Sequence, residues 1–158
     1  MKTLKLSLVL ALVLLPMSAF ADWTGAPSTG MIDESSAGIY SLDVASLGYN
    51  SSGSTTTIVS RLNVTDITGT GFPSWTTMEI RGYDPGASSQ VRAKLFRVSA
   101  GTISNLATCQ LTDNSMVSTS TCSIPSLDFT AGYMYVVQIE VSRTSTSVSP
   151  FINGVRIY

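Results

Sequence analysis

Apolar and polar residues alternate with a period of two along most of this chain, and this pattern constrains the fold more than any other feature. The longest clean stretch is 133–141, and shorter ones lie at 40–44 and 58–64. This period places successive side chains on opposite faces of a β-strand. No long stretch shows the 3.6-residue period of a helix, so the sequence predicts an all-β protein of about eight or nine short strands.

The first 21 residues differ from the rest of the chain. Lys2 and Lys5 precede an apolar run at 6–15, Pro16 follows it, and Ala19 and Ala21 stand where a signal peptidase reads small residues. The run is about half of the roughly 20 residues that span a bilayer. Residues 1–21 are therefore predicted to be a cleaved secretory signal. Residues 22–158 are predicted to form one exported domain, periplasmic or extracellular, without a membrane span.

The composition of residues 22–158 narrows the range of partners. Seven basic and ten acidic residues give a net charge of −3, with no basic run, so binding to nucleic acid is not expected. Ser and Thr account for 41 of these 137 residues, and they are interleaved with Ile, Val, Leu and Tyr rather than collected in one tract. This interleaving favours folded strands with a hydroxyl-rich exterior over disorder.

Two cysteines, Cys109 and Cys122, are predicted to form a disulfide, because an exported chain meets an oxidising compartment. On the chain-entropy account, closing this loop contributes about 3 kcal/mol of stability. Zinc prefers four ligands and the chain has no histidine, so no metal site and no cofactor are expected.

Two hairpins are predicted in register from the apolar pattern. The first turns at 84–89 and the second near 113–115, where it would place Cys109 opposite Cys122 and Ala107 opposite Ile124. The first register gives the following pairs: Tyr83 with Gln90, Arg81 with Arg92, Ile80 with Ala93, Glu79 with Lys94, and Met78 with Leu95. Many short strands with one disulfide favour an antiparallel two-sheet β-sandwich. A jelly-roll connection is favoured over an immunoglobulin-like one, largely on the number of strands, and the disulfide has neither the spacing nor the intervening Trp of a true immunoglobulin domain.

The first hairpin carries the candidate ligand site. Arg81 opposite Arg92 would place two like charges together, which is unfavourable in a sheet unless an anion lies between them. Arg81 and Arg92 are therefore candidate donors to an anion or a sugar, with Tyr83 as a stacking ring. The alternative is that Glu79 reaches Arg92 and the group is an ordinary surface cluster. Trp75 is a further candidate for stacking, with plugging of the core as its alternative role.

Catalytic groups are scarce. Without histidine there is no Ser-His-Asp or Cys-His arrangement, and Lys94 is the only lysine after the leader. The remaining route is a carboxylate pair such as Glu79 and Glu140. Both are expected to face solvent, and no catalytic residue is predicted.

In fold and composition the chain resembles small exported bacterial β-sandwiches, a class that includes many carbohydrate-binding modules, although no motif identifies a family. The leading hypothesis is a non-catalytic binding module for carbohydrate or a cell-surface glycan. The second is a structural or adhesive subunit that assembles through strand edges. The third is a glycoside hydrolase that uses paired carboxylates. The sequence does not indicate the ligand or the oligomeric state.

Overall fold

The computed structural model describes residues 21–50 and 53–158, in which the chain forms eleven strands and two 3-10 helices. Residues 1–20 of the predicted leader lie outside the described residues. No helix in the described ranges is long and apolar enough to cross a membrane. The elements are β1 (Trp23–Gly25), η1 (Pro27–Thr29), β2 (Met31–Ile32), η2 (Glu34–Ser36), β3 (Tyr40–Leu42), β4 (Leu47–Tyr49), β5 (Ile58–Val64), β6 (Thr77–Tyr83), β7 (Ser89–Ser99), β8 (Thr102–Gln110), β9 (Ser118–Ser123), β10 (Met134–Arg143) and β11 (Phe151–Ile157).

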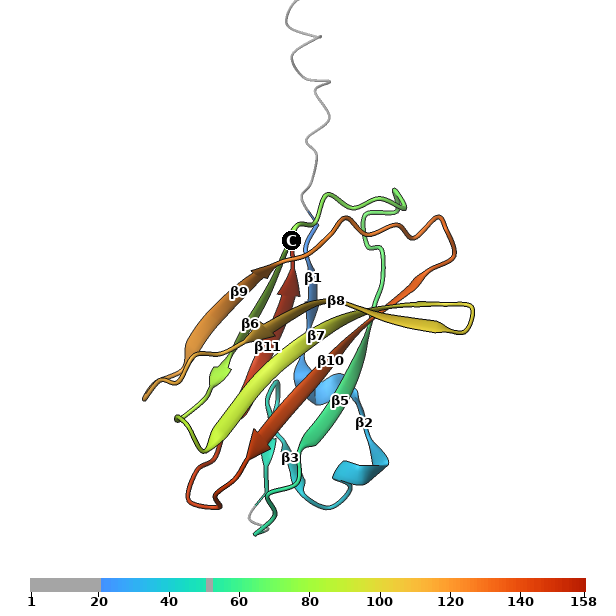
Figure 1. Cartoon of the computed structure of the whole chain (residues 1–158). Coiled ribbons are helices and arrows are strands. Elements are labelled where there is room, and N and C mark those ends of the chain that lie inside the picture. Colours follow the sequence, from blue (N-terminus) through green and yellow to red (C-terminus); the bar gives the residue numbers. More distant parts are fainter. Residues whose placement is uncertain (1–20, 51–52) are drawn as a thin grey trace, which may run out of the picture.

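The strands form two antiparallel sheets that pack against each other (Figure 1). The first sheet has the order β3-β4-β11-β6-β9, and β1 pairs with the end of β11; we call it the β11 sheet. The second has the order β2-β5-β10-β7-β8, and we call it the β10 sheet. The all-β, two-sheet architecture predicted from the alternation is confirmed.

The pairing of strands identifies the jelly roll. From the outside inwards, β4 pairs with β11, β5 with β10, β6 with β9 and β7 with β8. Nested pairs of this kind form when the chain makes one long hairpin, which here has its tip between β7 and β8. The hairpin is rolled up, so that successive strand pairs alternate between the two sheets. This is the jelly-roll arrangement favoured by the sequence.

The first predicted hairpin is wrong, because β6 and β7 belong to different sheets. β6 pairs with β11 and β9, whereas β7 pairs with β10 and β8. Ile80 and Ala93 both lie in the core, as the register required, but they reach it from opposite sheets. Apolar alternation specifies the inward face of a strand and not its partner.

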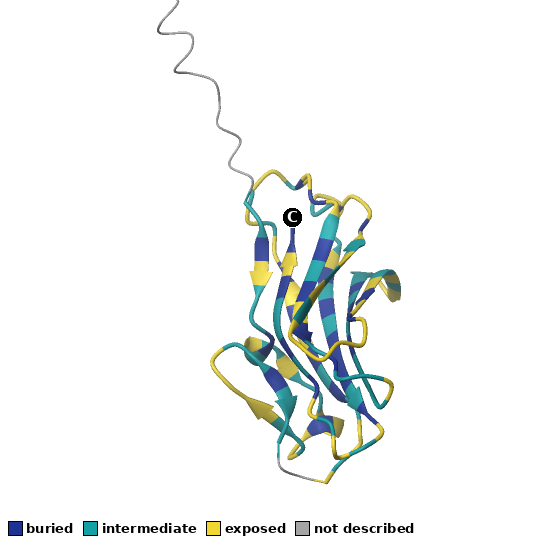
Figure 2. Ribbon diagram, turned by 90° about the vertical axis from the view of Figure 1, so that its left-hand side faces the viewer, coloured by how far each residue is buried: buried dark blue, intermediate teal, exposed yellow. Residues whose placement is uncertain are grey.

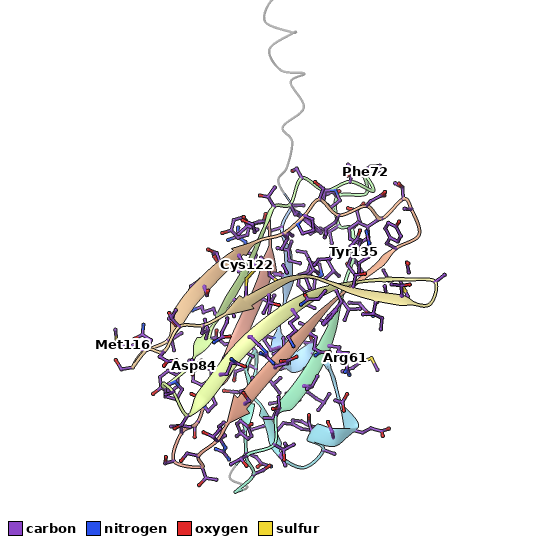
Figure 3. The ribbon with its side chains drawn as sticks, in the orientation of Figure 1. Arg61, Phe72, Asp84, Met116, Cys122 and Tyr135 are labelled. Atoms are coloured by element: carbon purple, nitrogen blue, oxygen red, sulfur yellow. A yellow bond between two sulfur atoms is a disulfide. The ribbon has the colours of Figure 1, made fainter. Side chains whose placement is uncertain are left out.

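Asp84 lies at the point where the chain crosses from one sheet to the other (Figure 3). Its side chain is fully buried. One carboxylate oxygen accepts a hydrogen bond from the Ser89 hydroxyl at 2.6 Å, and the other accepts one from the backbone N–H of Val91 at 3.2 Å. Asp84 therefore provides buried acceptors at the start of β7, where the crossing ends.

The disulfide between Cys109 and Cys122 is present, with a Cα–Cα distance of 5.4 Å. The hairpin predicted around it is wrong, because β8 pairs with β7 in the β10 sheet and β9 pairs with β6 in the β11 sheet. The bond therefore joins the edge strands of the two sheets rather than two strands of one hairpin. Figure 3 labels Cys122 on β9.

The core lies between the sheets and follows the predicted faces of the two most regular strands (Figure 2). The inward-facing residues of β5 and β10 are buried: Ile58, Ser60, Leu62, Val64, Tyr135, Val137, Ile139 and Val141. The first predicted strand is only partly confirmed. Val44 is 94% exposed because it falls in the turn after β3, and β3 is itself at the edge of its sheet.

Candidate functional site

The structure separates the predicted ligand-binding residues. Arg81 and Tyr83 point outward from β6 in the β11 sheet, while Arg92 points outward from β7 in the β10 sheet. The prediction that placed Arg81 across from Arg92 is wrong, since the two side chains lie on opposite outer faces of the sandwich. They do not hold one ligand together.

Trp75 lies in the core. Its side chain is 4% exposed, its indole N–H donates to the carbonyl of Ala21 at 2.8 Å, and its ring meets Phe129 edge to face at 6.4 Å. A ring in this position is not available for stacking on a ligand. Trp23 is buried in the same way, whereas Phe72 is exposed in a loop (Figure 3).

On the outer face of the β10 sheet, the charged groups neutralise one another. Glu140 is buried and accepts hydrogen bonds from the side chains of Lys94 at 2.7 Å, Gln138 at 2.7 Å, and Arg92. The expectation that Glu140 faces solvent is therefore wrong. Burial raises the pKa of Glu140, but the bonds from Lys94, Arg92 and Gln138 outweigh it and hold that pKa below its usual value. The cluster is an ion group whose members satisfy one another.

The neighbouring polar groups on the outer face of the β10 sheet are also paired with one another. Arg61 donates to Asp33 at 2.7 Å and to Gln138 at 3.2 Å (Figure 3 labels Arg61 on β5). The hydrogen bond from Arg61, followed by those from Ser35, lowers the pKa of Asp33 from 3.8 to about 2. Beside this network lies a mainly apolar hollow of about 320 Å³, lined by Arg61, Phe96, Val98, Ile103, Val136 and Gln138.

On the outer face of the β11 sheet, in contrast, several groups have no partner. The exposed guanidinium of Arg81 makes no hydrogen bond or ion pair with any described residue, and the same is true of the Tyr83 hydroxyl. The Tyr83 ring lies against that of Phe151, the residue opposite it in the ladder, with ring centroids 5.7 Å apart and an interplanar angle of 44°. Together these residues present two half-exposed rings beside a free cation.

A β-bulge in β11 shapes the centre of this face. The ladder with β6 shifts between Ile152 and Gly154, so Asn153 and Gly154 both lie on the outer side, opposite Arg81. The side-chain oxygen of Asn153 is buried and has no hydrogen-bond partner among the described residues. A Cβ on Gly154 would meet only the Cβ of Arg81, at 4.0 Å, so the missing side chain leaves space open.

Two hollows border Asn153. One of about 330 Å³ is lined by Thr24, Gly25, Ala26, Glu79, Arg81, Asn153, Gly154, Val155 and Arg156. The other, of about 430 Å³, is lined by Asp43, Ala45, Ser46, Phe151 and Asn153. Both are open hollows on the surface rather than enclosed pockets.

Arg156, the other cation of this face, is already engaged. It forms a salt bridge with Asp22, with an Nε–Oδ2 distance of 3.0 Å, and its guanidinium lies over the Tyr158 ring. The hydrogen bond that Arg156 donates to the Asp22 carboxylate raises the pKa of Arg156. Arg81 is thus the cation that this part of the described structure leaves free for a ligand.

The carboxylate pair considered for glycoside hydrolysis is not formed. Glu79 faces outward from the β11 sheet, next to Arg156, and Glu140 lies on the outer side of the β10 sheet. The two sides of a sandwich are separated by its core, about 10 Å thick between the sheets, whereas the acids of a glycosidase flank one bond. The hypothesis that Glu79 and Glu140 act together is therefore wrong.

Comparisons with known proteins identify no family. No family model and no curated protein matches the sequence. Among solved structures, the chain is similar to a CBM35 domain from Cellvibrio japonicus Abf62, with 15% identity over 87% of this chain and 93% of that one and a TM-score of 0.43. It is also similar to a Xyl-CBM35 solved with a glucuronic acid-containing disaccharide, with 17% identity over 82% of each chain and a TM-score of 0.43.

A third similar structure is the CBM22-2 xylan-binding domain from Paenibacillus barcinonensis Xyn10C, with 13% identity over 88% of this chain and 98% of that one and a TM-score of 0.45. Identities and scores this low do not place a ligand on this chain. Its site is defined by its own residues.

The sequence-based prediction named Arg81 and Tyr83 and did not include Phe151, Asn153 and Gly154, which the structure places beside them. A signal for the bulge is present, because the inward residues Ile152 and Val155 are three positions apart in a strand that otherwise alternates by two. Nothing in the sequence indicates that β11 lies beside β6.

Proposed function

We propose that this protein is an exported, non-catalytic carbohydrate-binding module whose site is the outer face of the β11 sheet. The observation that carries this proposal is the free guanidinium of Arg81 beside the paired rings of Tyr83 and Phe151. A sugar ring presents an apolar face that stacks on an aromatic ring, and hydroxyls that need donors and acceptors. Arg81 supplies donors, and Asn153 lines the hollows on both sides of it.

The rigidity of the site supports the same function. Arg81 and Tyr83 stand on β6, which is paired on both sides, and Phe151 and Asn153 stand on the strand next to it. Groups held on strands need little ordering when a ligand binds, which favours affinity. The disulfide is in keeping with export, because such bonds persist in oxidising compartments.

The test is binding of residues 22–158 to an array of xylan, cellulose, mannan and polygalacturonic acid. We expect at least one polymer to be retained and Arg81→Ala to weaken its binding at least tenfold. Arg61→Ala is the matched control, since this arginine lies beside the hollow on the opposite face. Retention of no polymer contradicts the proposal, and equal loss in the Arg61 variant would move the site to the β10 sheet.

The alternative is a structural or adhesive subunit, and strand β9 favours it. β9 pairs with β6 on one side only, and Ser118–Ser123 contain no charged residue and no proline, the usual protection of a strand edge. An assembling subunit would increase in size with concentration on gel filtration, whereas a binding module would elute at one position.

A further inference from the structure

We infer that the site takes an internal stretch of a polysaccharide chain, laid along β11, and not a single sugar or a chain end. This inference rests on the proposed function and specifies the class of ligand. Its basis is the way in which the hollows of this face join.

The hollows follow one another along β11, and we call this row of hollows the furrow. Those of about 330 and 430 Å³ share Asn153, and the second shares Asp43, Ser46 and Phe151 with a third hollow of about 240 Å³, which reaches Pro150. The furrow thus follows β11 from Arg156 back to its start. Seven strand residues at about 3.3 Å each span roughly 20 Å, longer than one sugar ring.

The furrow is bordered on two sides. One is the outer side of β6, with Glu79, Arg81 and Tyr83. The other is built from two separate segments on the far edge of β11: the β3–β4 hairpin, where Leu47 pairs with Ile152, and β1, where Gly25 pairs with Val155. The two short segments cover the two ends of this strand edge, and Asn153 and Gly154 lie between them.

Hydrogen bonds hold the side of the furrow that β1 and the β3–β4 hairpin form. The Ser28 hydroxyl in η1 donates to the carbonyl of Val44 at 3.2 Å and so ties the segment after β1 to the β3–β4 turn. Within that turn, Asp43 accepts a hydrogen bond from the N–H of Val44 at 2.8 Å and donates its own N–H to Ser46 at 3.1 Å. A fixed, open furrow accommodates a chain that continues past each subsite, whereas an enclosed pocket would suit a terminal sugar.

The test measures affinity against ligand length. Ladders of one to six sugars, cut from the four polymers of the array, are titrated into residues 22–158 by calorimetry. For the ladder of a retained polymer, we expect no measurable binding of the monosaccharide and at least a tenfold gain from the dimer to the pentamer. Equal affinity for the dimer and the hexamer overturns the inference while the proposed function stands. Retention of no polymer overturns the proposed function itself.

Two variants locate the chain in the furrow. Gly154→Val fills the floor beside Arg81, and the backbone allows it because Gly154 is not among the glycines with positive φ. We expect hexamer affinity to fall at least tenfold, to that of a shorter oligomer, with an unchanged unfolding midpoint. Arg61→Ala on the other face should keep the full length dependence. An unchanged hexamer affinity in the Gly154 variant contradicts the inference.

Discussion

Both outer faces of the sandwich carry polar side chains, but the two faces differ in how these side chains are paired. On the β10 sheet, Glu140 alone receives three side-chain hydrogen bonds, and Arg61 holds Asp33. On the β11 sheet, Arg81 and the Asn153 oxygen have no partner among the described residues. The contrast teaches that unused hydrogen-bonding capacity distinguishes a candidate site from a polar surface.

The backbones of the two central strands, β10 and β11, differ in their regularity. β10 pairs with both neighbours through continuous registers, so its outward side chains stand in regular rows and meet each other. β11 contains a bulge opposite β6, which places two consecutive residues outward and breaks the row. Bulges commonly redirect side chains next to binding sites.

The largest expected effect comes from removing the disulfide that joins the two sheets. Replacing Cys109 and Cys122 together by Ser should lower the free energy of unfolding by about 3 kcal/mol, because the loop between them gains freedom in the unfolded chain. Urea unfolding measures this loss. Since the bond joins β8 to β9, hydrogen exchange should speed up in both strands; faster exchange in one alone would contradict the inter-sheet link.

The next effect separates the two glutamates. Glu140→Ala should cost about 2 kcal/mol or more, because it leaves the partly buried Arg92 and Lys94 without their shared anion. Glu79→Ala should change stability by less than about 0.5 kcal/mol, as for most surface positions. The comparison is made by urea unfolding at neutral pH, and equal costs would refute the difference between the faces.

Acid should act mainly through groups of the β10 face. The pKa of Glu140 is lowered, and that of Asp33 falls from 3.8 to about 2, so their stabilisation is complete above the unfolded pKa and is lost as the pH falls through the folded one. The melting temperature should therefore drop between about pH 4.5 and pH 2. Hydrogen bonds within loops also lower the pKa of Asp66 and of Asp128, which add to the loss.

The variant Glu140→Gln tests the assignment of this acid loss. Its melting temperature should be lower than that of the unchanged protein at pH 7, and the gap should narrow as the pH falls and the lowered pKa of Glu140 is approached. A gap that stays constant with pH would show that ionisation of Glu140 does not contribute.

The sequence predicted the inward faces well, because burial imposes period two wherever a strand crosses the core. Ile58–Val64 and the inward residues of β10 are examples, and the pairing of Cys109 with Cys122 followed from there being two cysteines. Strand partners were not predictable in the same way. In a sandwich, consecutive strands of either sheet bury the same alternating pattern, so a crossing such as the one at Asp84 looks like a hairpin.

The candidate site was predicted only in part for the same reason. Arg81 and Tyr83 were proposed from one strand, but their neighbours Phe151 and Asn153 lie about 70 residues away in the sequence and are brought beside them by the pairing of β6 with β11. Arg92 was included because a wrong register placed it opposite Arg81. Only the order of the strands in the sheet decides whether Arg81 lies beside Arg92 or beside Phe151 and Asn153.

The smallest expected effect on stability is the most informative about the β11 face. Arg81→Ala should change the free energy of unfolding by no more than about 0.5 kcal/mol, since its guanidinium has no partner to lose. Arg92→Ala should cost more, because the buried Glu140 loses a donor. If Arg81→Ala instead proved as costly as Arg92→Ala in urea unfolding, Arg81 would have a structural role, and weaker glycan binding in that variant would no longer locate the ligand.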